Sequence, residues 1–144
     1  MDYLIRPLDH TDYDDITSLW DRAGLPYRLQ GRDSREAMTM EFKRMETAFI
    51  GMYDGERLIG AVIATSDGRK GWINRLAIDP DYRGKRLAAV LIDESERFLK
   101  DQGIKVVAAL IEDENLPSIA AFEKSGFIYH PDIFYFSKRE SEED

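Results

Sequence analysis

Apolar and polar positions in the first third of the chain predict one short strand and two helices. Residues 3–6 form an apolar run of the length of a short strand. Thr11, with Asp14 three residues later, is a capping-box-like start for a helix that Gly24 ends. Residues 34–45 are charged and rich in methionine, and they predict a second helix. The chain is therefore expected to begin as strand, helix, helix.

The middle of the chain predicts an antiparallel meander. Two apolar runs, 47–53 and 58–65, flank the dipeptide Asp54-Gly55. Because this dipeptide favours positive φ, the pattern predicts a hairpin. A polar turn then leads into a third apolar run at 72–78, which we expect to be the next strand.

The last third predicts helices that alternate with strands. A long helix is expected to end near Gly103, and the nearly continuous apolar run at 105–111 is typical of a strand covered on both faces. Asn115 is expected to cap a further helix that ends at Gly126, and short apolar runs within 127–137 predict closing strands. The apolar face of the long helix consists of Leu87, Val90, Leu91, Phe98 and Leu99.

This order of elements predicts an α/β (α+β) fold with a mixed central sheet of about six to seven strands and about four flanking helices. The sheet would combine the antiparallel meander with one parallel crossover through the long helix. A chain of 144 residues has the size of one domain, which we expect at 1–137, before a charged tail at 138–144.

Composition narrows the chemistry that is open to the chain. With 43% hydrophobic and 33% charged residues, it has the composition of a globular protein. It contains no cysteine, which excludes a disulfide framework, a thiolate zinc site and a cysteine nucleophile. The two histidines, His10 and His130, lie near opposite ends without metal-ligand spacing, so no metal is expected.

Net charge and hydropathy argue against two classes of partner, nucleic acids and membranes. The formal net charge of -8 argues against general nucleic-acid binding, which requires a basic face, and it suits a small cationic partner better. No apolar run approaches the ~20 residues that cross a bilayer, and the first residues have no signal-peptide apolar region. We therefore expect no nucleic acid and no membrane among the partners, and a cytoplasmic setting.

The run 76–88 passes from an apolar strand through a basic turn into a helix. Amides in the first turn of a helix have no intrahelical acceptor, so they attract anions, helped by the helix dipole. Arg83, Lys85 and Arg86 add three positive charges there, and Gly84 allows close approach of a ligand to the backbone. The pattern predicts a pyrophosphate site. Taken without its flanks, the basic turn is more often only a solvated loop, and the strand before it and the helix after it favour the pyrophosphate site.

Residues 83–88 resemble the acetyl-CoA motif of the GNAT superfamily of N-acetyltransferases, which is written Arg/Gln-x-x-Gly-x-Gly/Ala. Arg83 and Ala88 match the ends of the motif, whereas Arg86 stands where the motif has its central glycine. The predicted order of elements is similar to the GNAT fold over nearly the whole chain, most specifically at 72–127. Within the superfamily, the chain resembles small single-domain members such as the YpeA-like group.

The resemblance implies acetyl-CoA as the cofactor, with CoA as the product. The strand before the turn would hydrogen-bond the pantetheine arm, the amides of the turn would bind the pyrophosphate, and the helix at 115–126 would line the same site. The residues implied in cofactor binding are Leu76, Ala77, Ile78, Arg83, Gly84, Lys85, Arg86, Leu87, Ala88, Ala89, Asn115, Ser118 and Phe122. Asn115 is equally open to the plain role of helix cap.

Phe122 stands where many GNAT members have a tyrosine that protonates the leaving thiolate. Because phenylalanine lacks the hydroxyl, we expect it to pack in the core or against the cofactor, and the proton to come from Tyr129, Tyr135 or water. Glu112, at the end of the 105–111 run, is the candidate general base, directly or through a water molecule. An exposed acid in an acidic stretch is its alternative role.

Asn74 and Arg75 lie just before the cofactor strand residues, and one of them is expected to face the acceptor. Arg75 would bind an acceptor carboxylate, and a buried polar role is open for Asn74.

The leading hypothesis is an acetyltransferase that moves the acetyl group directly, without a covalent enzyme intermediate, to a small-molecule amine or to a protein N-terminus or lysine. The alternative is a non-catalytic acyl-CoA-binding or sensing domain. A monomer or a homodimer is expected.

Overall fold

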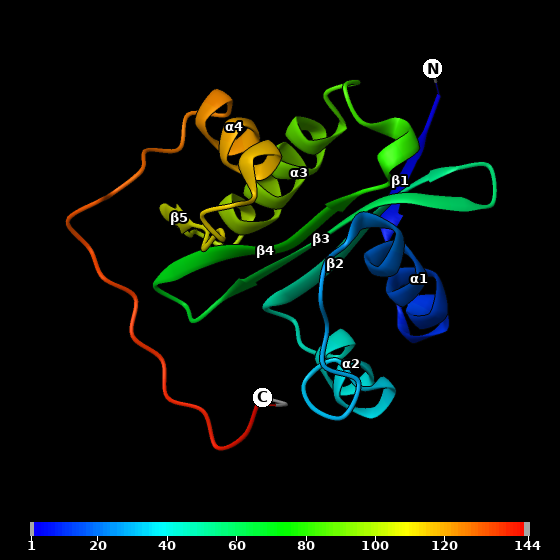
Figure 1. Cartoon of the computed structure of the whole chain (residues 1–144), viewed down its shortest axis with the longest axis horizontal. Coiled ribbons are helices and arrows are strands. Elements are labelled where there is room, and N and C mark those ends of the chain that lie inside the picture. Colours follow the sequence, from blue (N-terminus) through cyan, green and yellow to red (C-terminus); the bar gives the residue numbers. More distant parts are fainter. Residues whose placement is uncertain (1, 143–144) are drawn as a thin grey trace.

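The computed structural model describes residues 2–142 and contains one sheet with helices on both faces (Figure 1). The strands lie side by side in chain order as β1 (Leu4–Pro7), β2 (Thr47–Asp54), β3 (Arg57–Ser66), β4 (Lys70–Ile78) and β5 (Val106–Ala108). The helices are α1 (Tyr13–Ala23), α2 (Arg35–Phe42), α3 (Leu87–Asp101) and α4 (Leu116–Lys124), with short 3-10 turns at His10–Asp12 and Pro80–Tyr82.

The sheet is mixed, as the sequence predicts. Strands β1 to β4 pair antiparallel, and β5 pairs parallel to β4 after the crossover through α3. The prediction of an antiparallel meander followed by one parallel crossover is therefore confirmed, as is the prediction of four helices within residues 2–142.

Two apolar clusters form the core, one on each face of the sheet. Ile16, Leu19 and Trp20 of α1 and Met38 of α2 pack on one face. Residues of α3 pack on the opposite face, together with Phe122 of α4. Strand β3 serves both clusters, since successive side chains of a strand point to opposite faces, and its burial is nearly continuous.

The first helix begins differently from the prediction. A capping box of Asp9 and Asp12 starts the 3-10 turn that leads into α1, and Thr11 and Asp14 form none. The Asp9 carboxylate accepts from the Thr11 amide and the Asp12 carboxylate accepts from the Asp9 amide, both at 2.9 Å, whereas Asp12 as the N-cap of α1 makes no side-chain capping bond. Asp12 is buried and holds Arg6 of β1 at 2.9 Å, which raises the pKa of that guanidinium. Asp12 therefore joins the 3-10 turn to β1.

The structure corrects the predicted number of strands. The described chain has five strands, not six to seven, because β5 ends at Ala108 and residues 127–137 form no strand. Of the apolar run at 105–111, only three residues pair with β4, and the outer edge of β5 has no strand partner within residues 2–142. Residues 127–137 form no strand because this segment leaves the sheet and does not pair with the open outer edge of β5 (Figure 1).

Candidate functional site

The parallel strands β4 and β5 pair only at their first residues. The register runs from Lys70 opposite Val106 to Trp72 opposite Ala108, and β5 ends there. Residues 74–78 of β4 pair with β3 on one side and with no strand of the described chain on the other. The predicted cofactor residues Leu76, Ala77 and Ile78 therefore offer the N–H and C=O groups of an open strand edge.

A β-bulge distorts β4 within this open stretch. Asn74 pairs with Ile63 and Ala77 with Ala61, so β4 carries one more residue than β3 between these pairs. Arg75 occupies the bulge with φ of 57°, in the left-handed region that L residues rarely adopt. The bulge turns β4 relative to its neighbours where the edge opens.

The turn after β4 leads into a helix end whose amides are free to bind a ligand. Gly84 has φ of 81°, and Arg86 has φ of 62° and is the N-cap of α3. The Arg86 side chain makes no capping hydrogen bond, so the first-turn amides of α3 keep their N–H groups for another acceptor. The family motif has glycine at the position of Arg86, and the left-handed backbone is the physical reason for that preference.

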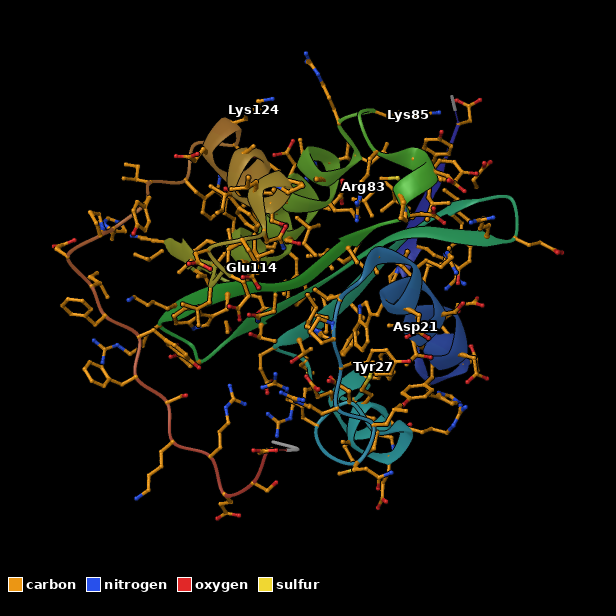
Figure 2. The ribbon with its side chains drawn as sticks, viewed as in Figure 1. Asp21, Tyr27, Arg83, Lys85, Glu114 and Lys124 are labelled. Carbon is orange, nitrogen blue, oxygen red and sulfur yellow. The ribbon has the colours of Figure 1, made fainter. Side chains whose placement is uncertain are left out.

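Basic side chains surround this helix end. Arg83, Lys85 and Arg86 are all exposed. Arg83 donates to the Ala23 carbonyl at the end of α1 at 3.4 Å, and the Lys85 ammonium lies 5.5 Å from the centre of the Tyr82 ring. Figure 2 shows Arg83 and Lys85 at the same turn. Charge and free amides together make this an anion site.

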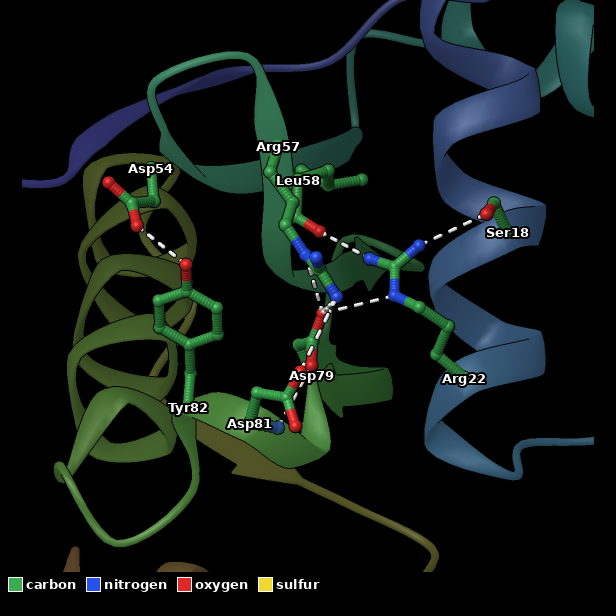
Figure 3. A network of polar contacts seen from close by, with 8 residues as sticks. All are labelled: Ser18, Arg22, Asp54, Arg57, Leu58, Asp79, Asp81 and Tyr82. Atoms are coloured by element: carbon green, nitrogen blue, oxygen red, sulfur yellow. Dashed lines mark hydrogen bonds and ion pairs between the residues drawn. The ribbon is translucent and has the colours of Figure 1, made fainter.

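A buried carboxylate holds the turn in place (Figure 3). Asp79 is 1% exposed and accepts from Arg22 of α1 at 3.0 Å, from Arg57 of β3 at 2.9 Å and from the Asp81 amide at 2.9 Å. Burial alone would raise the pKa of Asp79, but the hydrogen bonds from Asp81, Arg57 and Arg22 outweigh it, so the pKa lies below its ordinary value. Arg22 also donates to the Leu58 carbonyl at 2.7 Å.

The sequence interpretation missed this network. Asp79 was visible there only as an acid before Pro80 at the end of a strand. Its partners Arg22 and Arg57 lie 57 and 22 residues away in the chain, and no local pattern links them to it.

The second predicted cofactor segment is the start of α4. The Asn115 side chain caps the helix by accepting from the Ser118 amide at 3.3 Å, so the role of helix cap is confirmed. Phe122 is buried, and its ring packs edge to face against Phe127 with centroids 5.0 Å apart. Phe122 is a core residue, as the sequence indicates, and its contact with a cofactor stays a prediction.

The predicted acid and base candidates lie on irregular, exposed backbone. Glu112 is not at the end of a strand as expected, because β5 ends four residues earlier; it lies in the loop before α4, where its carbonyl accepts from the Asn115 amide. Tyr129 and Tyr135 are 76% and 65% exposed and do not lie on closing strands. Figure 1 shows the segment after α4, which carries the two tyrosines, running away from the turn after β4.

Asn74 and Arg75 both lie on the face of β4 covered by α1. Asn74 donates to the Thr65 hydroxyl at 3.5 Å. Thr65 lies two residues after buried Ile63, so both side chains point to the face that α1 covers. The Arg75 guanidinium lies over the Trp20 ring at 4.1 Å and donates to the Pro26 carbonyl at 2.7 Å. Burial lowers the pKa of Arg75. Arg75 thus holds the loop between α1 and α2 against β4, while two of its nitrogens, Nε and Nη2, lack a hydrogen-bond partner.

That loop encloses an open hollow of about 640 Å³ beside the site. Arg75 of the bulge and Arg83 of the turn both donate to backbone next to it, at Pro26 and Ala23. Asp21 and Tyr27 lie on its wall (Figure 2), and a hydrogen bond to Asp21 raises the pKa of the Tyr27 phenol. The sequence interpretation missed both residues, because a helical acid and a loop tyrosine carry no signal of their own.

A second hollow, of about 480 Å³, lies near β1 and the end of α3. Its walls include Arg6, Phe42, Thr47 and Arg97, and none of the predicted site residues. It therefore plays no part in the site described above.

Two further predictions concern metals and membranes. Within residues 2–142, no three His, Asp or Glu side chains gather where they could hold a metal ion, and whether the protein uses a metal stays a prediction. No helix among these residues has the length and apolar character to cross a bilayer, and the cytoplasmic setting stays a prediction.

Comparisons with known proteins agree with this architecture. The acetyltransferase (GNAT) family matches residues 12–127. The acetyltransferase SG1711 of Sodalis glossinidius (strain morsitans) is 25% identical over 137 residues, which are 94% of each chain.

Solved structures share the fold. The PaiA N-acetyltransferase of Thermoplasma acidophilum, in complex with coenzyme A, has a TM-score of 0.79 at 21% identity, over 90% of this chain and 92% of that one. AAC(6')-Iy, in complex with a CoA bisubstrate analogue, has a TM-score of 0.79 at 18% identity, over 96% and 99% of the two chains. The resemblance to the YpeA-like group is not confirmed by these comparisons and stays a prediction.

Proposed function

Because the chain belongs to the GNAT family of acetyltransferases, we propose that it transfers an acetyl group from acetyl-CoA directly to an amine acceptor. One observation carries the proposal: the open edge of β4 continues into the uncapped, basic end of α3. A strand edge suits an arm that carries amides, and a helix end suits a pyrophosphate, and here the two follow each other directly.

The residues present fit acetyl-CoA. Leu76, Ala77 and Ile78 would bind the pantetheine arm through their backbone, and the amides from Gly84 to Ala89 would bind the pyrophosphate. Arg83, Lys85 and Arg86 would neutralise its charge. Asn115 and Ser118, at the start of α4, would lie on the other side of the arm, next to buried Phe122.

When bound, acetyl-CoA supplies an activated thioester. In the transfer, the C–N bond to the acceptor forms and the C–S bond breaks, the amine loses a proton, and the departing thiolate takes one up. Glu112, exposed in the loop after β5, is our candidate for proton removal through water. Tyr129, Tyr135 or water would supply the thiolate proton, because Phe122 has no hydroxyl to give.

We assign the acceptor to the hollow between α1 and α2. Its wall carries the Asp21 carboxylate and the aromatic ring of Tyr27, and the chain as a whole is acidic. Such a wall suits a cationic amine through charge attraction and cation–π contact. AAC(6')-Iy, a structure of the same fold, was solved with an acetylneamine-based bisubstrate analogue, which supports a polar amine as the acceptor class.

A second candidate function is an acyl-CoA sensor that binds without transfer. Buried Phe122 and the exposed position of Glu112 favour it, because neither gives an ordered acid or base at the site.

Two measurements test these functions in sequence. Calorimetric titration with acetyl-CoA is expected to give saturable 1:1 binding, and no binding at millimolar ligand would rule out both functions. A panel of amines, read by release of free thiol, then separates them. Acceptor-dependent thiol release above hydrolysis supports transfer, whereas saturable binding with no release for any amine supports the sensor.

A further inference from the structure

The buried side-chain nitrogens that lack a hydrogen-bond partner gather at one place in the protein. Among residues 2–142, the buried side-chain polar atoms without a partner are Nε1 of Trp20 and Nε and Nη2 of Arg75. The central carbon of the Arg75 guanidinium lies 4.1 Å from the centre of the Trp20 ring, so these atoms share one site. All three carry N–H donors and none is an acceptor. Because a buried donor without a partner is costly, the site fits a ligand group that brings only acceptors.

The two nitrogens of Arg75 form the edge of a guanidinium that binds carboxylates. The N–H groups of Nε and Nη2 lie side by side along this edge, in a fork that matches a carboxylate. Arg57 uses the same two nitrogens to hold Asp79, at 3.1 and 2.9 Å (Figure 3). For Arg75, the Asp33 carboxylate lies 3.8 Å from Nη2, beyond hydrogen-bonding distance, and accepts instead from the Arg28 amide at 2.7 Å. No side chain of the described residues therefore completes the Arg75 fork.

Arg75 lies between the proposed cofactor edge and the acceptor hollow. It occupies the bulge of β4, directly before Leu76, the first of the predicted cofactor residues on that strand. Its third nitrogen, Nη1, donates to the Pro26 carbonyl at 2.7 Å. Pro26 also lies on the wall of the hollow, with Asp21 and Tyr27 (Figure 2). Pro26 therefore contacts both the guanidinium and the hollow.

The segment that encloses the fork is able to shift without loss of sheet or helix pairing. Residues 25–34, between α1 and α2, belong to neither a helix nor a strand. A shift of Pro26 breaks the hydrogen bond that it accepts from Arg75. A carboxylate that reaches the guanidinium from the hollow replaces this bond with charge-assisted hydrogen bonds, which are stronger.

We propose that the acceptor is an amine that also carries a carboxylate, as amino acids do, and that Arg75 binds this carboxylate through Nε and Nη2. The indole N–H of Trp20 is a further donor at the same place. Asp21, on the wall of the hollow, attracts the ammonium group, so each end of the acceptor meets the opposite charge. The inference rests on the proposed function, because it names the acceptor class of the same site.

Pairs of ligands that differ in the carboxylate test this anchor by binding alone. The pairs are L-lysine with cadaverine, L-leucine with isoamylamine, and L-phenylalanine with phenethylamine. The chain has two tryptophans, so the variant W72F leaves Trp20, against the guanidinium, as the sole indole reporter. Titration of W72F, with and without CoA, is followed by Trp20 fluorescence.

We expect the amino acid of at least one pair to bind with a Kd at least about 10-fold lower than that of its decarboxylated amine. Equal or weaker binding of the amino acid in every pair, or no response to any amino acid at millimolar concentration, would overturn the inference. This comparison uses the chain with Arg75 intact, so it does not depend on whether an Arg75 variant folds.

Substitution of Arg75 separates the fork from its charge. In the W72F chain, R75K keeps the positive charge but loses the fork, and we expect the preference for the amino acid to fall to about 3-fold or less. R69Q removes an exposed arginine from the turn between β3 and β4, and as the matched control it is expected to keep the preference. Circular dichroism checks that R75K is folded. An undiminished preference in folded R75K would contradict the role of Arg75.

Release of free thiol from acetyl-CoA distinguishes failure of the carboxylate anchor from failure of the proposed function. A higher kcat/KM for the amino acid than for its decarboxylated amine supports both. Equal kcat/KM within every pair supports acetyl transfer and overturns the anchor. Preferential binding of amino acids without thiol release from any pair supports the anchor and counts against transfer.

Discussion

Two loops follow the parallel strands, and they are held in very different ways. The turn after β4 is fixed by buried Asp79, which joins α1, β3 and the turn itself through Arg22, Arg57 and the Asp81 amide. The loop after β5 has exposed acids at 112–114, and its backbone hydrogen bonds are local, from the Asn115 amide to the Glu112 carbonyl and from the Leu116 amide to the Glu114 carbonyl. The first loop is held in one geometry by buried contacts, whereas the second has few contacts that fix its side chains.

The unequal rigidity of the two loops suggests that the protein fixes the groups for cofactor binding more firmly than the groups for acetyl transfer. A pyrophosphate site needs backbone amides held in one geometry, and the Asp79 network supplies that rigidity before any ligand arrives. Acid and base groups can be supplied later, by the acceptor or by water. The structure therefore supports the proposed cofactor more strongly than it supports any one proton donor or acceptor.

The largest expected effect, on the free energy of unfolding, comes from breaking the Asp79 network that holds the turn after β4. D79N removes the charge that pairs Arg22 and Arg57, and we expect a loss of about 3 kcal/mol in the free energy of unfolding, at the low end for a buried pair because the arginines are 30% and 48% exposed. Urea unfolding measures it. D81N is the matched control, because Asp81 is exposed and lies 3.7 Å from Arg57, and a comparable loss there would contradict the role given to Asp79.

The stability difference between wild type and D79N is expected to depend on pH. The folded-state pKa of Asp79 lies below its unfolded value, so its stabilisation is present above the unfolded pKa of about 3.9 and is lost as pH falls through the folded value. The gap in stability between wild type and D79N is therefore expected to be full at pH 7 and to shrink below about pH 4. A gap that widened on acidification would be inconsistent with this sign.

The next effect tests the anion site without touching the network. G84D forces a β-carbon onto a backbone with φ of 81° and adds a carboxylate near the phosphates, and we expect about 100-fold weaker CoA binding by calorimetry. G103D has the same φ at the other end of α3 and equally open space for a side chain. It should lose similar stability but keep its CoA affinity, and equal losses of affinity would assign the effect to folding.

A smaller effect is expected on the acceptor side. D21N removes the carboxylate from the wall of the hollow, and we expect about a 10-fold rise in the KM of a cationic amine with little change in CoA affinity. D93N, which removes an exposed acid from α3, controls for the change in net charge. Parallel shifts in KM for both variants would indicate general electrostatics instead of a local site.

The smallest effect concerns Arg86. R86G relieves a left-handed arginine, and after the entropic cost of glycine we expect a gain of about 1 kcal/mol, or ~3 °C in Tm. R83G, at an extended position with φ of -70°, is the comparison and should lower stability. If both variants shifted Tm in the same direction, backbone strain at Arg86 would not be the cause.

Local patterns predicted most of the elements. The hairpin around Gly55, the strand before Asp79 and the helix after Arg86 depend on periodicity and turn residues close together in sequence. The strand count was wrong, because an apolar run becomes a strand only when its backbone pairs with a sheet edge, and the residues after Gly126 do not pair with the open edge of β5.

The sequence by itself determined the helices, the meander, the crossover and a basic turn that suits a pyrophosphate, since each rests on neighbours a few residues apart. Only the tertiary structure decided that Asp79 holds the turn, that β4 opens at a bulge, that Asp21 and Tyr27 share a hollow, and that residues 127–137 leave the sheet. These features join residues that are far apart in the chain, and their energies come from burial and pairing that no local pattern records.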